Sequence, residues 1–155
     1  MVEKFAGILD RPATEIEKPP ALPPGTYLAI VKGLPRYDKS SKKQTDFIEF
    51  TLAIQRAEED VSEKDLQAFL TKKDGSTRAL TDINMKNTYY LTEDAAWRLK
   101  KFLGDLGFDT DDEEHTLREM CEQSTNCEVY ISVKQRPSED GKSVFAEIKD
   151  TAKVE

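Results

Sequence analysis

Side chains that could carry covalent or metal chemistry are few in this chain of 155 residues. His115 is the only histidine, and it lies in an acidic segment with no nucleophile motif beside it. Cys121 and Cys127 are the only cysteines, and they form no CxxC pair or Cys/His cluster of the kind that binds zinc. The acidic run 109–114 lacks EF-hand spacing, and no glycine-rich phosphate loop occurs. The sequence therefore predicts no enzyme, no metal and no cofactor.

Positively charged residues, in contrast, gather in two short stretches, 32–43 and 134–142, although the chain as a whole has a net charge of −7. Such a chain repels polyanions overall, so any nucleic-acid binding would have to come from local patches like these. The candidate phosphate-binding residues are Lys32, Arg36, Lys39, Lys42, Lys43, Lys134, Arg136 and Lys142. The alternative is that these side chains are simply solvated and protect strand edges.

Aromatic residues accompany these cations. Tyr37 lies inside the first basic stretch, and Phe47, Tyr130 and Phe145 fall opposite the aliphatic stripes of predicted strands, as does Tyr27. Bases of a single strand stack on exposed rings with little regard to sequence. These rings are therefore candidate base-binding residues, and the alternative is that the N-terminal arm, a long excursion or a second subunit covers them. Trp97 is assigned to the core or to the edge of a helix.

Two segments alternate between apolar and other residues with the period of a half-buried strand, 47–55 and 127–134. Their inward residues are expected to be Ile48, Phe50, Leu52, Ile54, Val129, Ile131 and Val133. Further strands are predicted at 26–32, at 78–90 with a break near 84–87, and at 144–149, where a turn with Asp-Gly completes a hairpin.

Helix signals are clearest over 92–106, where Thr92 could cap the first turn and Gly107 follows the last. Short helices are also expected within 57–70, capped by Ser62, and around Leu117. Residues 1–25 hold five of the seven prolines, which predicts an extended arm before a domain spanning 26–155. We find no signal peptide and no apolar run long enough to cross a bilayer, so we expect a soluble, cytoplasmic protein with no membrane partner.

Three strands, a helix and a final hairpin follow one another in the order typical of an OB-fold. This is a mainly β architecture, a five-stranded barrel with one helix between strands three and four. An OB-fold binds oligonucleotides on the face of strands two and three, between the loops that join strands one to two and four to five. The two basic stretches fall in these loops and are expected to converge. A generic α+β sandwich shares the element order and stays open as an alternative.

The chain also resembles a family of tailed-phage proteins, long labelled only as a domain of unknown function and now regarded as OB-fold single-stranded DNA-binding proteins. The resemblance is carried by Leu-Pro-Pro-Gly-Thr-Tyr at 22–27 and by the Lys/Ser-rich loop before 47–54. It also includes Lys-Lys-Phe-Leu-Gly-Asp-Leu-Gly at 100–107 and the final hairpin from 128 with its Pro-Ser-Glu-Asp-Gly turn.

The resemblance implies a non-catalytic protein that binds single-stranded DNA with weak sequence preference during phage replication or recombination in the host-cell cytoplasm. Phage or host replication and recombination proteins would be its further partners. The alternative is a protein-interaction module, an inhibitor or assembly component, whose acidic segment 109–122 binds a basic partner. For DNA binding, this segment is expected on the side away from the basic loops.

Overall fold

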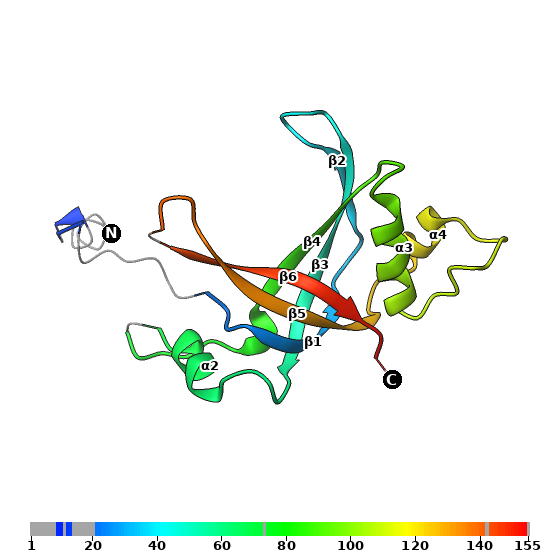
Figure 1. Cartoon of the computed structure of the whole chain (residues 1–155). Coiled ribbons are helices and arrows are strands. Elements are labelled where there is room, and N and C mark those ends of the chain that lie inside the picture. The colour runs from blue at the N-terminus through cyan, green and yellow to red at the C-terminus, as the bar shows by residue number, and fades with distance from the viewer. Residues whose placement is uncertain (1–8, 11, 14–20, 73, 142, 155) are drawn as a thin grey trace.

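The computed structural model describes residues 9–10, 12–13, 21–72, 74–141 and 143–154. Within these ranges the fold is mainly β, with a six-stranded antiparallel sheet and three short helices (Figure 1). The strands are β1 (Gly25–Val31), β2 (Arg36–Lys39), β3 (Asp46–Ala57), β4 (Asn84–Tyr90), β5 (Glu128–Pro137) and β6 (Val144–Ala152). The helices are α2 (Glu63–Leu70), α3 (Ala96–Asp105) and α4 (Leu117–Glu122), and a 3-10 turn, η2 (Leu80–Asp82), precedes β4. Most of the predicted N-terminal arm lies outside the described residues.

The long strand β3 organises the sheet. Its first residues pair with β2 and its second half pairs with β1, while β4 pairs along its other edge. On the far side of β1 the ladder continues through β5 to β6, which gives the order β2-β3-β1-β5-β6. All of these pairs are antiparallel, so short connections can join most successive strands.

The predicted inward residues of 47–55 and 127–134 are all buried, which confirms both alternating patterns. Helix α3 covers one end of this core with Leu99, Phe102 and Leu103. The Phe102 ring lies 4.9 Å from that of Phe50 and 5.2 Å from that of Tyr89, measured between centroids. This ring cluster fixes the helix against β3 and β4.

The prediction of five strands closed into a barrel is wrong in both number and closure. Among the described strands, no hydrogen-bonded ladder joins β4 to β6. Side chains of α3 reach the β6 edge instead: Lys101 Nζ donates to the Thr151 carbonyl at 2.9 Å, and Thr151 Oγ1 donates to Asp105 at 2.6 Å. Helix α3 therefore spans the seam and contacts both β4 and β6. The backbone groups of these two strands do not pair with each other.

Three element boundaries also differ from the sequence prediction. The expected polar loop 36–44 contains β2, because Arg36 and Lys39 face acidic cross-strand partners on β3. The third predicted strand begins only at Asn84 and then runs unbroken to Tyr90. Helix α3 begins at Ala96, since Thr92 caps a separate turn through a hydrogen bond from the Ala95 amide, 3.2 Å.

Tyr27 lies in the core and not on the outer face as predicted. Residues 27–31 are apolar throughout, so a period-two pattern could be placed in either phase. The register with β5 sets the phase, pairing Tyr27 with buried Ile131. The Tyr27 hydroxyl donates to the Pro23 carbonyl at 2.6 Å, and burial raises the pKa of this phenol to about 12.

The excursion after β3 is fastened to the start of β1. Asp60 accepts hydrogen bonds from the backbone and hydroxyl of Thr26 at 2.9 and 2.8 Å, which lowers the pKa of its carboxyl. Gly25 adopts φ +139°, and a Cβ there would lie 2.6 Å from Val61 Cγ2. Glycine is required at this position because both the backbone angle and the close approach exclude a side chain.

Candidate nucleic-acid interface

The outer face of β3 and β4 presents an aromatic pair. Phe47 and Tyr90 are cross-strand neighbours with ring centroids 6.4 Å apart and planes tilted by 56°. Tyr90 is 49% exposed and Phe47 is half-buried. The Arg36 guanidinium from β2 lies 5.2 Å from the centre of the Phe47 ring. This face therefore offers rings on which bases could stack, with a cation beside them.

Charges on the same face are largely compensated within the ladder. Arg36 forms ion pairs with Asp38 at 2.7 Å and with Glu49 at 3.5 Å. On the opposite face of β2, beside Tyr37, Lys39 pairs with Asp46 at 3.2 Å. Lys86 on β4 instead donates to the Thr51 hydroxyl at 2.7 Å, and no carboxylate pairs with it among the described residues. Of these cations, Lys86 is thus the one best able to receive a phosphate.

The turn between β2 and β3 carries two lysines beyond the end of the ladder. Lys42 and Lys43 are exposed, and within the described part of the chain neither they nor Lys32 form an ion pair. Hydrogen bonds from the Ser40 amide to the Thr45 carbonyl and from the Gln44 amide to the Ser40 carbonyl shape this turn. A groove of about 600 Å³ separates the turn from Tyr90, Thr92 and Ala95. The turn lysines therefore border the exposed Tyr90 ring.

The β5–β6 hairpin holds the second basic stretch. Lys134 and Arg136 both form ion pairs with Glu147, at 3.2 and 3.3 Å, and Arg136 faces the partly exposed Phe145 across the ladder. Lys142 lies outside the described residues. The tip of this hairpin and that of the β2–β3 hairpin point in different directions and stand well apart (Figure 1). The two basic stretches flank the sheet and do not form one continuous patch.

Two predicted ring positions lie away from the Phe47–Tyr90 pair. Tyr130 accepts a hydrogen bond from Arg56 at 3.4 Å and borders a hollow with Glu58, Glu59 and Asp60, an acidic setting that disfavours phosphate. Tyr37 lies on the opposite face of β2, where it lines an apolar groove with Leu117 and Cys121 of α4.

The acidic segment 109–122 is not wholly separated from the candidate residues. Its loop projects on the side of the molecule opposite the β5–β6 tip (Figure 1). Its helix α4, however, places Arg118 at 5.4 Å from the centre of the Tyr37 ring. Burial raises the pKa of Tyr37, and the nearby Glu122 contributes in the same direction. The expected separation of acidic and basic surfaces therefore holds for the loop of the segment and not for α4.

Sequence reasoning missed Tyr90, Lys86, Trp97 and Arg98. Trp97 is 59% exposed, which rules out the predicted place in the core and leaves the predicted helix edge. The sequence did indicate this exposure, because Trp97 lies one residue off the apolar stripe of α3. Tyr90 and Lys86 fall on the outward phase of β4, which could be identified only once the strand was known to be unbroken.

The described part of the chain holds one histidine and two cysteines, and none of them belongs to a cluster suited to a metal ion. No group of three or more His, Cys, Asp or Glu side chains among them could hold a metal ion. His115 Nδ1 lies 2.6 Å from Asp112, whose hydrogen bond raises the pKa of the imidazole. Burial raises the pKa of the Cys121 thiol to about 11, which leaves it protonated and unreactive near neutral pH.

The chain matches no protein-family model and resembles no curated protein closely enough to indicate a family. None of the helices in the described ranges is long and apolar enough to span a membrane.

Proposed function

We propose that this protein is a non-catalytic single-stranded DNA-binding protein whose sheet is an open form of the OB-fold. The connectivity supports this fold: β1 pairs with both β3 and β5, β4 pairs with β3, β6 pairs with β5, and α3 and α4 lie between β4 and β5 in the chain. In this interpretation β2 is an extension of the first OB strand, and the seam between β4 and β6 is where a closed barrel would join.

The observation that carries the proposal is the arrangement around Tyr90. Two mutually tilted rings, Phe47 and Tyr90, lie on the face formed by the second and third OB strands, and the turn lysines Lys42 and Lys43 line the groove that Tyr90 borders. Cations without carboxylate partners next to exposed rings suit a flexible strand, in which phosphates and unstacked bases alternate. In a chain of net charge −7, this combination favours nucleic acid locally against the overall field.

Sequence preference should be weak, because stacking and phosphate contacts do not read base edges. A role in phage replication or recombination is the corresponding biological proposal, and it rests on the family resemblance of the sequence alone.

The test is fluorescence anisotropy with a labelled oligo(dT) strand of about 30 nucleotides, titrated at several salt concentrations between about 50 and 200 mM. Wild-type protein should bind, and a duplex of the same length should bind more weakly. Lys42→Ala/Lys43→Ala should flatten the plot of log K against log salt by about 1.4, or about 0.7 for each lost phosphate contact.

A matched control exists on the other side of the molecule. Lys64→Ala/Lys72→Ala removes the same charge from α2 and the residues after it, and α2 lies far from the β2–β3 turn (Figure 1). This control should keep the wild-type slope. Absence of oligo(dT) binding by wild-type protein at the lowest salt would overturn the proposal.

A protein-interaction module is the second candidate, favoured by the acidic loop that projects beside α4. In that case wild-type protein would fail to bind oligo(dT) and would instead retain a basic protein partner, with binding weakened by Asp-to-Asn changes at 109, 111 and 112.

A further inference from the structure

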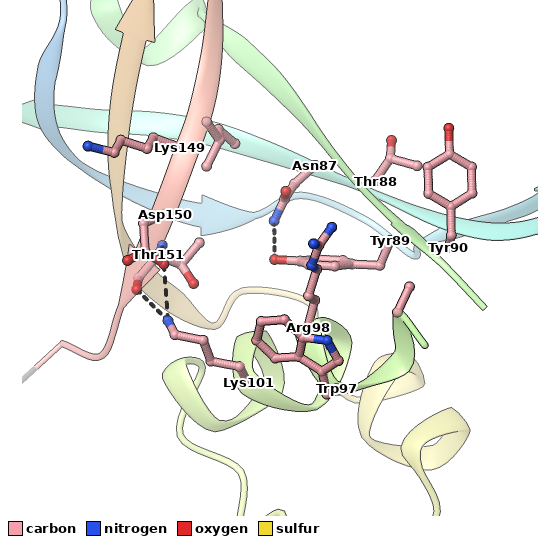
Figure 2. Close-up of a pocket in the computed structure, with 12 residues that line it drawn as sticks. Asn87, Thr88, Tyr89, Tyr90, Trp97, Arg98, Lys101, Lys149, Asp150 and Thr151 are labelled. Carbon is pink, nitrogen blue, oxygen red and sulfur yellow. Dashed lines mark hydrogen bonds and ion pairs between the residues drawn. The ribbon is translucent and has the colours of Figure 1, made fainter. Parts of the chain in front are cut away.

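A second groove opens where the sheet fails to close. Its volume is about 330 Å³, and it is bordered by the end of β4, the first turns of α3 and the end of β6 (Figure 2). The residues of β4 and β6 that border it are 87–90 and 148–151. Because no strand partner crosses this seam among the described residues, the groove is accessible along the length of α3 that faces it.

Trp97 and Arg98 form the α3 side of the groove. The Arg98 guanidinium carbon lies 5.4 Å from the centre of the Trp97 ring, and in Figure 2 Arg98 extends from α3 toward β4. Trp97 is 59% exposed, although an indole is one of the largest apolar surfaces a protein can bury. No ion pair of Arg98 is found among the described residues. An exposed ring and an uncompensated cation therefore stand side by side.

The helix that presents them is held rigidly. Phe102 packs between Phe50 and Tyr89, and Lys101 bonds both Asp105 and Asp150, at 2.8 and 3.2 Å. The pKa of Lys101 is raised chiefly by its hydrogen bond to Asp105. These contacts hold α3 against β4 and β6, so the fold sets the backbone position from which Trp97 projects. A backbone that is already in place lowers the entropy lost when a site is ordered on binding.

The seam groove continues into the groove beneath the β2–β3 turn. Tyr90 and Ala95 border both, so a path leads from Lys42 and Lys43 past Tyr90 to Trp97. Along the two grooves the charged side chains are Lys42, Lys43, Arg98, Lys101, Lys149 and Asp150. The only carboxylate among them already pairs with Lys101. The path is thus locally cationic in an acidic protein, as a phosphate chain requires.

We infer that Trp97 and Arg98 form a further subsite for single-stranded DNA, in which a base stacks on the indole and the adjoining phosphate pairs with the guanidinium. The strand would run from the turn lysines over Tyr90 and then across the seam between β4 and β6. This inference rests on the proposed function, since it extends the path of the same ligand onto α3.

Trp97 supplies its own reporter, because it is the only tryptophan in the chain. Titrating wild-type protein with unlabelled oligo(dT) should quench its fluorescence and protect it from acrylamide, with the same midpoint as anisotropy of the labelled strand. Trp97→Ala should weaken binding about 5- to 150-fold, the range found for loss of one stacked base, and Trp97→Phe should weaken it much less. Arg98→Ala should flatten the salt plot by about 0.7.

Leu34→Ala is the matched control, since it truncates a side chain that is 74% exposed outside both grooves. It should bind as wild type does, and circular dichroism should show all variants folded. Oligo(dT) binding by anisotropy with unchanged tryptophan fluorescence and a Trp97→Ala affinity within twofold of wild type would overturn the subsite and leave the proposed function standing. Lack of any wild-type binding would overturn both.

Discussion

In the β2–β3 hairpin, Lys42 and Lys43 stand at the turn beyond the last strand pair, whereas in the β5–β6 hairpin Lys134 and Arg136 lie within the ladder. Both ladder cations share the carboxylate of Glu147. The turn lysines have no carboxylate partner among the described residues. Both stretches contain several basic residues in sequence, yet their cations differ in how far they are free to meet a ligand.

Position relative to the ladder accounts for this difference. A residue inside an antiparallel ladder has a cross-strand neighbour about 5 Å away, close enough for a long side chain to reach. Arg36 and Lys39 follow the same rule as Lys134, since each meets an acidic residue of β3. A residue in the turn faces solvent. Counting basic residues in a loop therefore overestimates the charge that is free to bind phosphate.

The largest expected effect is on the stability of the sheet to which both hairpins belong. Phe50→Ala should lower the free energy of unfolding by roughly 3–5 kcal/mol, because it removes a fully buried ring that packs against Phe102. Urea denaturation followed by circular dichroism measures the change. Phe47→Ala, three residues earlier on the outer face, should cost far less. Equal losses for the two variants would contradict the assignment of inner and outer faces.

Aromatic residues provide the next test of the two hairpins. Tyr90→Ala, beside the turn lysines, should weaken oligo(dT) binding by roughly 1–3 kcal/mol while leaving the salt slope unchanged, because stacking involves no counterion release. Phe145→Ala on the β5–β6 hairpin is its counterpart and should change affinity less than twofold. Anisotropy titrations of both variants would reveal a reversed order if the β5–β6 hairpin were the main binding surface.

Ladder cations should contribute less than turn cations to salt dependence. We expect Lys134→Ala/Arg136→Ala to change the slope of log K against log salt by less than about 0.7, since Glu147 already neutralises much of their charge. The same titrations measure this slope beside that of Lys42→Ala/Lys43→Ala. A larger change in the β5–β6 variant would show that the ligand displaces Glu147 and uses both cations.

Much of the core could be predicted from the sequence because 47–55 and 127–134 each have one apolar and one mixed face. The pattern failed at Tyr27, where both faces are apolar, and at β2, where all four residues are exposed and three are charged. Barrel closure could not be predicted, because alternation identifies strands and not their partners. The contacts of α3 with both edges of the seam are tertiary, and no strand pattern reveals them.

The candidate site was harder to predict, because its charges depend on register. Ser132 pairs with Asp150, so a regular ladder would place Lys134 opposite Ile148. A bulge after Ser132 shifts the register by one residue and brings Glu147 opposite Lys134 instead. Nothing in the composition of the hairpin reveals this shift. The exposed ring of Trp97, in contrast, was foreshadowed by its place off the apolar stripe of α3.

The smallest expected effect follows from the same bulge. Glu147→Gln keeps the shape of the side chain but removes the charge that Lys134 and Arg136 share. Surface ion pairs of this kind contribute about 0–1 kcal/mol, so the free energy of unfolding should change little. Oligo(dT) affinity should rise no more than about fivefold, because two cations become available beside the sheet. The slope of log K against log salt should steepen at the same time, by up to about 1.4 if both cations contact phosphates.

Glu139→Gln, in the turn of the same hairpin, is the control, because it removes an equal charge from a residue that faces neither cation in the ladder. If the two variants steepen the plot equally, net charge alone explains the gain, and the difference between ladder and turn cations does not control binding.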